Sequence, residues 1–269
     1  MSARAVLAFG MTLILFLGAC GERKSDGPSK AAAPSPHASA PPSPKPSPPP
    51  PKPSVAPKPT KITPAPLRPL PHKLPEGLRR STGVRAVALT FDDGPDPVWT
   101  PKILDQLRRA KAKATFCVVG TRAREYPELV ARIVREGHQL CNHSWRHDMD
   151  LARRSTAEIR ADLTRTNRAI QAAAPGAKVP FYRQPGGRWS ARVVAVSKQL
   201  GMQSLHWRVD PQDWDKPTST TIKRRVNGAV RPGAVVLLHD GGGNRAATIA
   251  ACAHLIGALK RHYGLVRLT

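Results

Sequence analysis

From residue 84 to residue 269, short apolar segments alternate with amphipathic segments, and this alternation limits the chain to few folds. The apolar segments have the length of buried strands, and the amphipathic segments repeat apolar residues at helical spacing. Strands joined by helices through short connections form a parallel sheet with right-handed crossovers. We therefore predict an α/β domain with strands at 85–91, 114–119, 137–141, 179–183, 202–209, 234–239 and 265–268, and helices at 101–111, 126–136, 156–173, 191–200, 218–230 and 246–261.

Polar or charged residues end or follow five of the predicted strands. The alternation by itself permits either an open doubly wound sheet or a barrel. In (β/α) barrels the functional site is built at the C-terminal ends of the strands, so this placement favours an irregular barrel of seven or eight units. The residues at these strand ends are Asp92, Asp93, His143, His147, Arg183, Asp210 and His239.

Residues 1–19 have the pattern of an export signal, with one arginine, an apolar run and small residues before a cleavage point. The run is shorter than the roughly 20 residues that a membrane span requires. The sequence Leu-Gly-Ala-Cys at 17–20 resembles the lipobox of bacterial lipoproteins, which implies cleavage before Cys20 and a lipidated thiol. The alternative is an ordinary secretory signal with an incidental cysteine. The lipoprotein interpretation predicts an extracytoplasmic protein that is anchored to the membrane by lipid and faces the cell wall.

The segment 20–83 is predicted to be a disordered linker. It holds 19 of the 29 prolines between residues 28 and 75 and has no apolar periodicity, so it cannot bury a core. At about 3.1 Å per residue, an extended chain of the 48 residues from 28 to 75 reaches on the order of 150 Å. Such a spacer suits a domain that stands off a membrane. A ligand for proline-recognising domains is the alternative.

The net charge is +25, of which +16 falls on residues 84–269. A strongly basic domain predicts an anionic partner. Because export makes nucleic acid an improbable partner, the charge favours cell-wall polymers or anionic lipid headgroups. A generally basic proteome would give the same excess.

Besides Cys20, the chain has three cysteines, so at least one thiol stays unpaired if the others form a bridge. Cys117 and Cys141 lie in strand-like segments, and Cys252 lies in a helical pattern. A bridge between Cys117 and Cys141 requires neighbouring strands, which the sequence leaves open.

Two short motifs carry groups suited to binding a metal. Asp92 and Asp93 follow an apolar run and precede Gly-Pro, which is typical of a strand that presents two carboxylates, although a polar turn would look the same. His143 and His147 are four residues apart, a spacing at which two imidazoles can bind one ion. Two histidines with one carboxylate leave open coordination positions, as in catalytic metal sites. We expect one divalent cation, and zinc suits this set.

Five motifs in order resemble those of the polysaccharide deacetylases, the NodB homology domain of carbohydrate esterase family 4, over roughly residues 84–269. They are Thr-Phe-Asp-Asp-Gly-Pro at 90–95, His143 to His147, Arg-Gln-Pro-Gly-Gly at 183–187, Asp-Pro-Gln-Asp-Trp at 210–214 and Leu-Leu-His at 237–239. The resemblance implies a distorted (β/α) barrel and metal-dependent removal of acetyl groups from amino sugars or, in some members, from xylan.

Position by position, the resemblance implies a metal site and a catalytic base. Asp93, His143 and His147 would be the metal ligands, whereas Asp92 would be the base and Arg183 would hold it. An acid is also needed, because an amine is a poor leaving group unless it is protonated.

The resemblance assigns the general acid to His239 and the carboxylate that tunes it to Asp210. Asp213 is the alternative for the second role. Trp214 and Leu237 would form the walls of the acetyl pocket. Gly186 stands where the family often has an aromatic side chain; its N–H can face an oxyanion, but a stacking wall is missing.

Together these features predict a metal-dependent deacetylase that acts on N-acetylglucosamine in peptidoglycan, most simply as a monomer. One alternative is a chitooligosaccharide deacetylase or acetylxylan esterase. Another is a catalytically silent wall-binding lipoprotein, which would have no need of Asp92 and His239 together.

Overall fold

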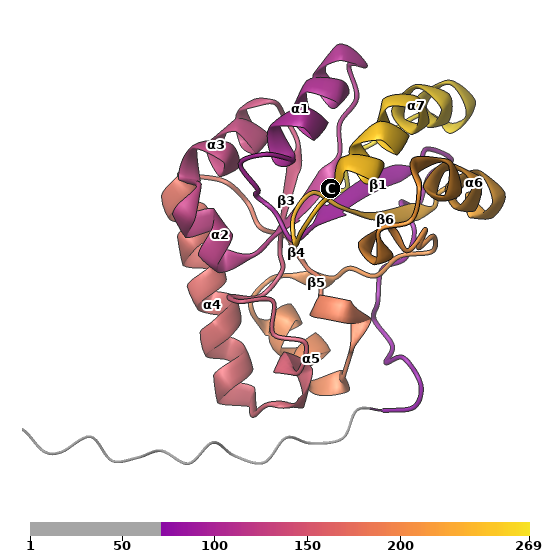
Figure 1. Cartoon of the computed structure of the whole chain (residues 1–269). Helices are drawn as coiled ribbons and strands as arrows, with labels where there is room; N and C mark the ends of the chain where they lie inside the picture. The colour runs from indigo at the N-terminus through magenta and orange to yellow at the C-terminus, as the bar shows by residue number, and fades with distance from the viewer. Residues whose placement is uncertain (1–70) are drawn as a thin grey trace, which may run out of the picture. The chain divides into compact units, whose positions relative to one another are not determined.

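The computed structural model describes residues 71–269 (Figure 1). The predicted signal, Cys20 and the linker as far as residue 70 lie outside these residues. The folded part begins earlier than the predicted residue 84, because Arg79 already pairs with Leu205 in a parallel bridge. The Arg79 N–H donates to the Ser204 carbonyl at 2.8 Å, and the Arg79 carbonyl accepts from the His206 N–H at 2.7 Å. Backbone pairing of this kind leaves no apolar pattern in the sequence.

The expected α/β fold is confirmed: a curled, parallel six-stranded sheet with the strand order β5-β4-β3-β2-β1-β6. The strands are β1 (Ala88–Asp92), β2 (Thr115–Val118), β3 (Gln139–Asn142), β4 (Phe181–Tyr182), β5 (Gln203–Ser204) and β6 (Val235–His239). Within residues 71–269 the sheet has six strands where the sequence predicted seven. The segment predicted as a last strand contributes only a bridge between Val87 and Leu265.

The long fifth strand predicted at 202–209 is split in the structure, and the split explains the distortion of the barrel. Its first part, β5, pairs with β4, whereas Val209 pairs with Val236 of β6. The Val209 carbonyl accepts from the Leu237 N–H at 2.9 Å. The two edges of the curled sheet therefore meet through one short segment rather than through a full ladder.

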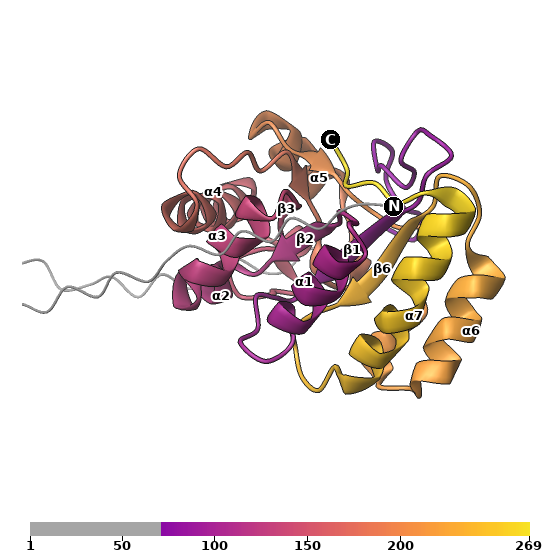
Figure 2. The ribbon, with the colours of Figure 1, turned by 90° about the horizontal axis from the view of Figure 1, so that it is seen from above.

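Helices surround the sheet, and α6 and α7 cover the side opposite α2, α3 and α4 (Figure 2). The helix predicted at 126–136 begins at Pro127, and a short helix precedes it. The sequence did not reveal this short helix, because only two of its residues are buried. None of the helices between residues 71 and 269 is long and apolar enough to cross a membrane. The helices are α1 (Thr100–Arg109), α2 (Gly120–Glu125), α3 (Pro127–Arg135), α4 (Thr156–Ala173), α5 (Ala191–Gln199), α6 (Ser219–Ala229) and α7 (Ala246–Tyr263), with short 3₁₀ turns η1 (Leu151–Arg153), η2 (Pro185–Gly187) and η3 (Asp213–Asp215).

Alternation along the strands divides the core into an outer and an inner part. In β1, Leu89 and Phe91 belong to the large apolar cluster that packs under the helices, whereas Ala88 belongs to a smaller cluster that includes residues of β2, β3 and β6. The smaller cluster holds Cys117 and Cys141, which face each other in register on β2 and β3 and form a disulfide. The inner residues further along the strands are polar, and they form the site.

Candidate active site

Asp92 ends β1 on the inner side of the sheet and is 2% exposed. Arg183, which follows β4 and is fully buried, donates from Nη1 to Asp92 Oδ1 at 2.7 Å. The same nitrogen donates to Thr90 Oγ1 at 2.8 Å, and Nε donates to the Leu205 carbonyl at 3.2 Å. A buried carboxylate needs such a partner, because removing a charge from water is costly unless it is paired. The predicted pairing of Arg183 with Asp92 is thus present.

Asp93, His143 and His147 offer ligand atoms that lie within 4.8 Å of one another. Asp93 Oδ1 is 3.4 Å from His143 Nε2 and 3.2 Å from His147 Nε2. This oxygen is buried and has no hydrogen-bond partner among the described residues. A buried carboxylate oxygen that has no hydrogen-bond partner and lies between two imidazole nitrogens is suited to binding a cation. The three residues therefore fit a metal.

Metal binding requires a carboxylate and neutral imidazoles, and Asp93 and His147 favour these forms. For His143, burial lowers the pKa, but the negative charges of Asp92 and Asp93 outweigh burial and raise the pKa, so a cation would displace a proton from this residue. Burial raises the pKa of Asp93, but the close approach of His143 and the positive charges of His239, His143 and His147 outweigh burial and hold the pKa well below its ordinary value. Burial and the charge of His143 lower the pKa of His147. The His143 Nδ1 lies 2.8 Å from the Arg183 carbonyl, and donation to that carbonyl leaves Nε2 free to face Asp93.

His239 ends β6, and its partner is Asp213, not the predicted Asp210. Asp213 Oδ1 lies 2.7 Å from His239 Nδ1, and Asp213 Oδ2 accepts from the His239 N–H at 3.0 Å and from Thr248 Oγ1 at 2.8 Å. Asp213 is 1% exposed, whereas Asp210 is exposed and its Oδ1 accepts from the Gln212 N–H at 2.8 Å. The assignment to Asp210 is therefore corrected.

The electrostatic surroundings favour a protonated His239. Burial lowers the pKa of His239, but the bond to Asp213 and the negative charges of Asp213, Asp93 and Asp92 outweigh this effect and raise the pKa to about 9. The imidazolium is thus the stable form of His239 at neutral pH.

One cavity of about 380 Å³ brings together all the predicted site residues within the described part of the chain except Arg183, which lies beneath it. Two of its walls, Met149 and Trp207, were not predicted. The residues that line it are Asp92, Asp93, His143, His147, Met149, Gly186, Trp207, Asp210, Trp214, Leu237 and His239.

Met149 occupies the space beside Gly186 in which the sequence predicted a missing wall. A Cβ atom on Gly186 would collide with Met149 Cε, and Gly186 has a left-handed backbone with φ of 61°. The Gln184 side chain donates to the Asp148 and Met149 carbonyls at 3.4 and 3.5 Å, which links the two segments. Met149 is 40% exposed and Trp214 is 50% exposed, so both can contact a ligand.

Arg245 and Asp240 support the site and were not predicted. Arg245 is 3% exposed, and it donates to the Gly241 carbonyl at 2.6 Å and to the Asp213 carbonyl at 3.2 Å. It therefore links the loop after His239 to η3. Asp240, which is 1% exposed, donates from its N–H to the Asp92 carbonyl at 3.0 Å and accepts from Thr100 Oγ1 at 2.5 Å.

The comparisons with known proteins identify the class to which this fold and site belong. The family model for polysaccharide deacetylase matches residues 79–205. The chain is 42% identical over 191 residues to a chitooligosaccharide deacetylase of Bradyrhizobium, which covers 67% of this chain and 87% of that protein. The chain therefore belongs to the polysaccharide deacetylase family. This confirms the family that its five motifs predicted.

Two solved structures are similar to the chain in both fold and sequence. A peptidoglycan N-acetylglucosamine deacetylase matches with a TM-score of 0.67 and 34% identity over 71% of this chain and 89% of that one. A pseudoenzyme of Bacillus anthracis matches with a TM-score of 0.63 and 31% identity over 68% of this chain and 64% of that one. Members of the same fold therefore include both an active and an inactive protein, so activity has to be argued from the site itself.

Proposed function

We propose that this protein hydrolyses the acetamide of N-acetylglucosamine in peptidoglycan with the help of one divalent cation, most suitably zinc. The observation that carries the proposal is the convergence, in one cavity, of the Asp93–His143–His147 cluster with two further groups suited to moving protons, Asp92 and His239. A binding module would need the shape of the cavity but not these opposed groups.

The metal would be held by Asp93, His143 and His147. When bound, a divalent cation acidifies water and polarises a carbonyl group, which makes amide hydrolysis feasible at neutral pH. The three residues leave coordination positions open, as a catalytic site requires and a structural zinc site does not. The orphaned Asp93 oxygen supports this assignment.

Asp92 would be the general base that takes a proton from the attacking water. Its second oxygen, Oδ2, lies 3.6 Å from His143 Nε2, which places it beside the metal cluster, while Oδ1 is bound by Arg183. The ion pair with Arg183 fixes the orientation of the carboxylate. Arg183 would thus act by positioning Asp92 rather than by touching the substrate.

His239 would be the general acid that protonates the leaving nitrogen. It lines the same cavity as Asp92, and Asp213 keeps it protonated and fixes its ring. Hydrolysis of an unactivated amide needs one group that accepts a proton and another that donates one. The intact pair argues against the silent wall-binding alternative, although one structural relative is a pseudoenzyme.

The rest of the cavity would bind the acetyl group and the sugar. Leu237 is 3% exposed and would contact the acetyl methyl, whereas the exposed faces of Trp214 and Met149 would contact the sugar. Gly186 also lines the cavity.

Peptidoglycan is favoured over free chitooligosaccharides by the proposed location of the protein. The sequence 17–20 supports a lipid on Cys20, and the proline-rich segment supports a spacer that places the domain outside the cytoplasm, beside the wall. Mass spectrometry of the mature N-terminus tests this part directly. A wild-type start elsewhere than Cys20, without lipid, would refute the anchor and leave the chemistry untouched.

The test of the activity is acetate release from sacculi, chitooligosaccharides and acetylxylan, measured side by side with wild-type protein and Asp92→Asn. We expect release from sacculi, accompanied by an equal amount of new free amine, and a loss of roughly 10²–10⁴-fold in the variant. Release of acetate from xylan alone, without new amines in sacculi, would instead support an esterase.

A further inference from the structure

We propose that the exposed face of α4 is a docking surface for a linear polyanion that carries phosphodiester groups. Three arginines, Arg160, Arg165 and Arg168, line one open hollow of about 630 Å³ on this face. This inference rests on α4 and does not depend on the proposed hydrolysis. The remaining lining residues are Thr156, Ala157, Ala161 and Thr164.

The positive charge of this face is offset only in part within the described domain, where Asp162 interacts with the charge of Arg165 without forming an ion pair. No carboxylate lines the hollow, and none of the three arginines forms an ion pair among residues 71–269. Two acids of α4 are bound elsewhere. Glu158 accepts from the Ser155 N–H at 3.0 Å in a helix cap, and Asp162 accepts from the Trp145 N–H at 2.8 Å.

The geometry of the face suits an extended polymer. Arg160 and Arg168 lie two turns apart, which is about 12 Å along the helix axis, so they can contact successive charges of one chain. Ala157, Ala161 and Thr164 form a floor of small side chains that lets a polymer approach the helix closely. Guanidinium groups bind the two free oxygens of a phosphodiester through paired N–H donors.

Arg165 is held in place by the loop of the candidate metal site. Its guanidinium lies 3.9 Å from the centre of the Trp145 ring, and Arg124 lies 5.1 Å from the same ring. Stacking on an aromatic ring leaves the N–H edge of a guanidinium free to bind an anion. Because Trp145 lies between His143 and His147 in the chain, a polymer bound here would lie near the loop that carries both histidines.

Two other anionic partners fit this face less well. A helix that binds a membrane surface presents large apolar side chains beside its basic ones, but the exposed large apolar residues of the described domain lie outside α4, at Leu74, Val84, Val98, Met149 and Trp214. Single-stranded nucleic acid is bound by stacking on aromatic rings, and no aromatic residue lines this hollow. A polyanion that carries no nucleobases is the partner that matches both the positive charge of the three arginines and the small side chains between them.

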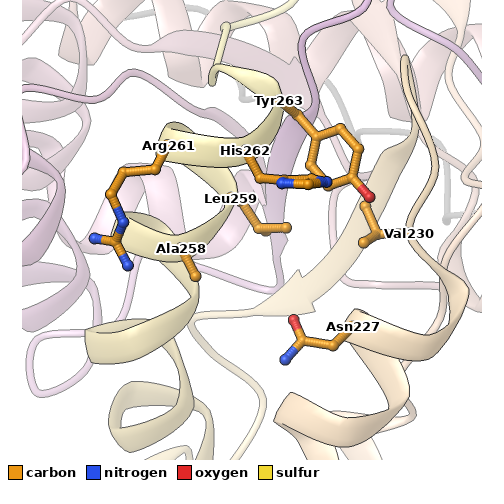
Figure 3. A pocket seen from close by; sticks show the side chains of 7 residues that line it. All are labelled: Asn227, Val230, Ala258, Leu259, Arg261, His262 and Tyr263. Carbon is orange, nitrogen blue, oxygen red and sulfur yellow. The ribbon is translucent and has the colours of Figure 1, made fainter.

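A second hollow, between α6 and α7, provides a matched comparison (Figure 3). Arg261 is the one permanently charged residue that lines it, beside His262 and Tyr263. Lys223 and Arg224 lie on α6, which packs against α7. These three basic residues also form no ion pair in the described domain, so neutralising them removes as much charge as neutralising the three arginines of α4.

The test measures binding of poly(glycerol phosphate) to the full chain by isothermal titration calorimetry over a range of salt concentrations. Every protein carries Cys20→Ser, so that a lipid contributes nothing. The α4 variant combines Arg160→Gln, Arg165→Gln and Arg168→Gln, and we expect its affinity to fall about tenfold or more. The slope of log affinity against log salt should become shallower by about two, because fewer counterions are released.

The control variant combines Lys223→Gln, Arg224→Gln and Arg261→Gln, and its affinity should stay within about twofold of wild type, since only distant charge is lost. Equal weakening in both variants would overturn the proposal, because binding would then follow net charge alone. If the α4 variant does not fold, the double variant Arg160→Gln with Arg168→Gln is used instead. It keeps the contact of Arg165 with Trp145, and it should still weaken binding several-fold.

Parallel titrations with phosphatidylglycerol vesicles and single-stranded DNA decide between partners. Tighter α4-dependent binding to the polymer than to either of these supports the proposal. Binding to vesicles alone, or DNA binding that matches the polymer and is lost in the α4 variant, would show that another class of anion occupies this face.

Discussion

Replacing Asp213 by asparagine should shift the alkaline limb of the pH–rate profile. Asparagine can keep an acceptor opposite the His239 ring, which lies 2.7 Å from the carboxylate in the wild-type protein, but its NH2 group replaces the oxygen that accepts from the His239 N–H, so one hydrogen bond is also lost. What the substitution removes is a buried negative charge in direct contact with the imidazolium. Asp213 is the carboxylate that contacts the His239 ring directly, so the protonation of His239 depends on it most strongly.

The size of the effect follows from the pKa of His239. His239 acts as an acid only when it is protonated, so the rate should fall as the pH rises through the pKa of His239. The surrounding negative charges raise this pKa to about 9. Loss of one contacting charge lowers a histidine pKa by about 1–3. With a decrease of about 2, the protonated fraction at pH 8 falls from about nine-tenths to about one-tenth, and the rate falls about tenfold. At pH 6 the two proteins should differ little for this reason alone.

The assay is kcat/KM for acetate release from a soluble chitooligosaccharide between pH 5 and 10. Asp210→Asn is the matched control, because Asp210 is exposed and contacts the Gln212 N–H rather than His239. Its alkaline limb should coincide with that of wild type. An Asp213→Asn profile with the wild-type alkaline limb would refute the reasoning, and a shift in Asp210→Asn alone would restore the original assignment.

Three further predictions concern the metal, the cavity wall and the disulfide. His143→Ala should lose most bound zinc after dialysis, measured by atomic absorption, because three ligands are the minimum for a catalytic zinc; His254→Ala, an exposed position, should keep one ion per chain, and equal contents would mean that the ligands are misassigned. Met149→Ala should raise KM several-fold with kcat little changed, because it removes a wall that binds substrate and transition state alike; a fall in kcat at constant KM would contradict this role. Replacing Cys117 and Cys141 together by alanine should lower the free energy of unfolding by about 3 kcal/mol in denaturant titrations, since the bridge spans a sequence separation of 24; an unchanged midpoint would exclude a stabilising bridge.

The sequence was sufficient to predict which strand ends carry the chemistry. Side chains alternate along a strand, so residues such as Asp92 and His239 at the ends of inner rows must meet at one edge of a parallel sheet. The spacing of His143 and His147 similarly limits them to one side of a short loop. These are local or periodic properties, which a sequence displays directly.

What the sequence could not predict depends on contacts between distant segments. Asp210 and Asp213 are both acidic and three residues apart, and only the turn η3, which follows Gln212 in a left-handed conformation, directs Asp213 towards His239. Met149 fills the space beside Gly186 because two loops converge there. The disulfide required the register of β2 and β3, which no local pattern contains.

Metal dependence of acetate release from sacculi tests the central claim most directly. Wild-type protein is assayed as purified, after removal of metal by a chelator, and after return of one equivalent of zinc, with Asp93→Ala treated in the same way. We predict that activity disappears with the metal, returns at about one ion per chain, and cannot be restored in Asp93→Ala, whose cluster lacks its carboxylate. Full acetate release from protein shown to be free of metal would contradict the account.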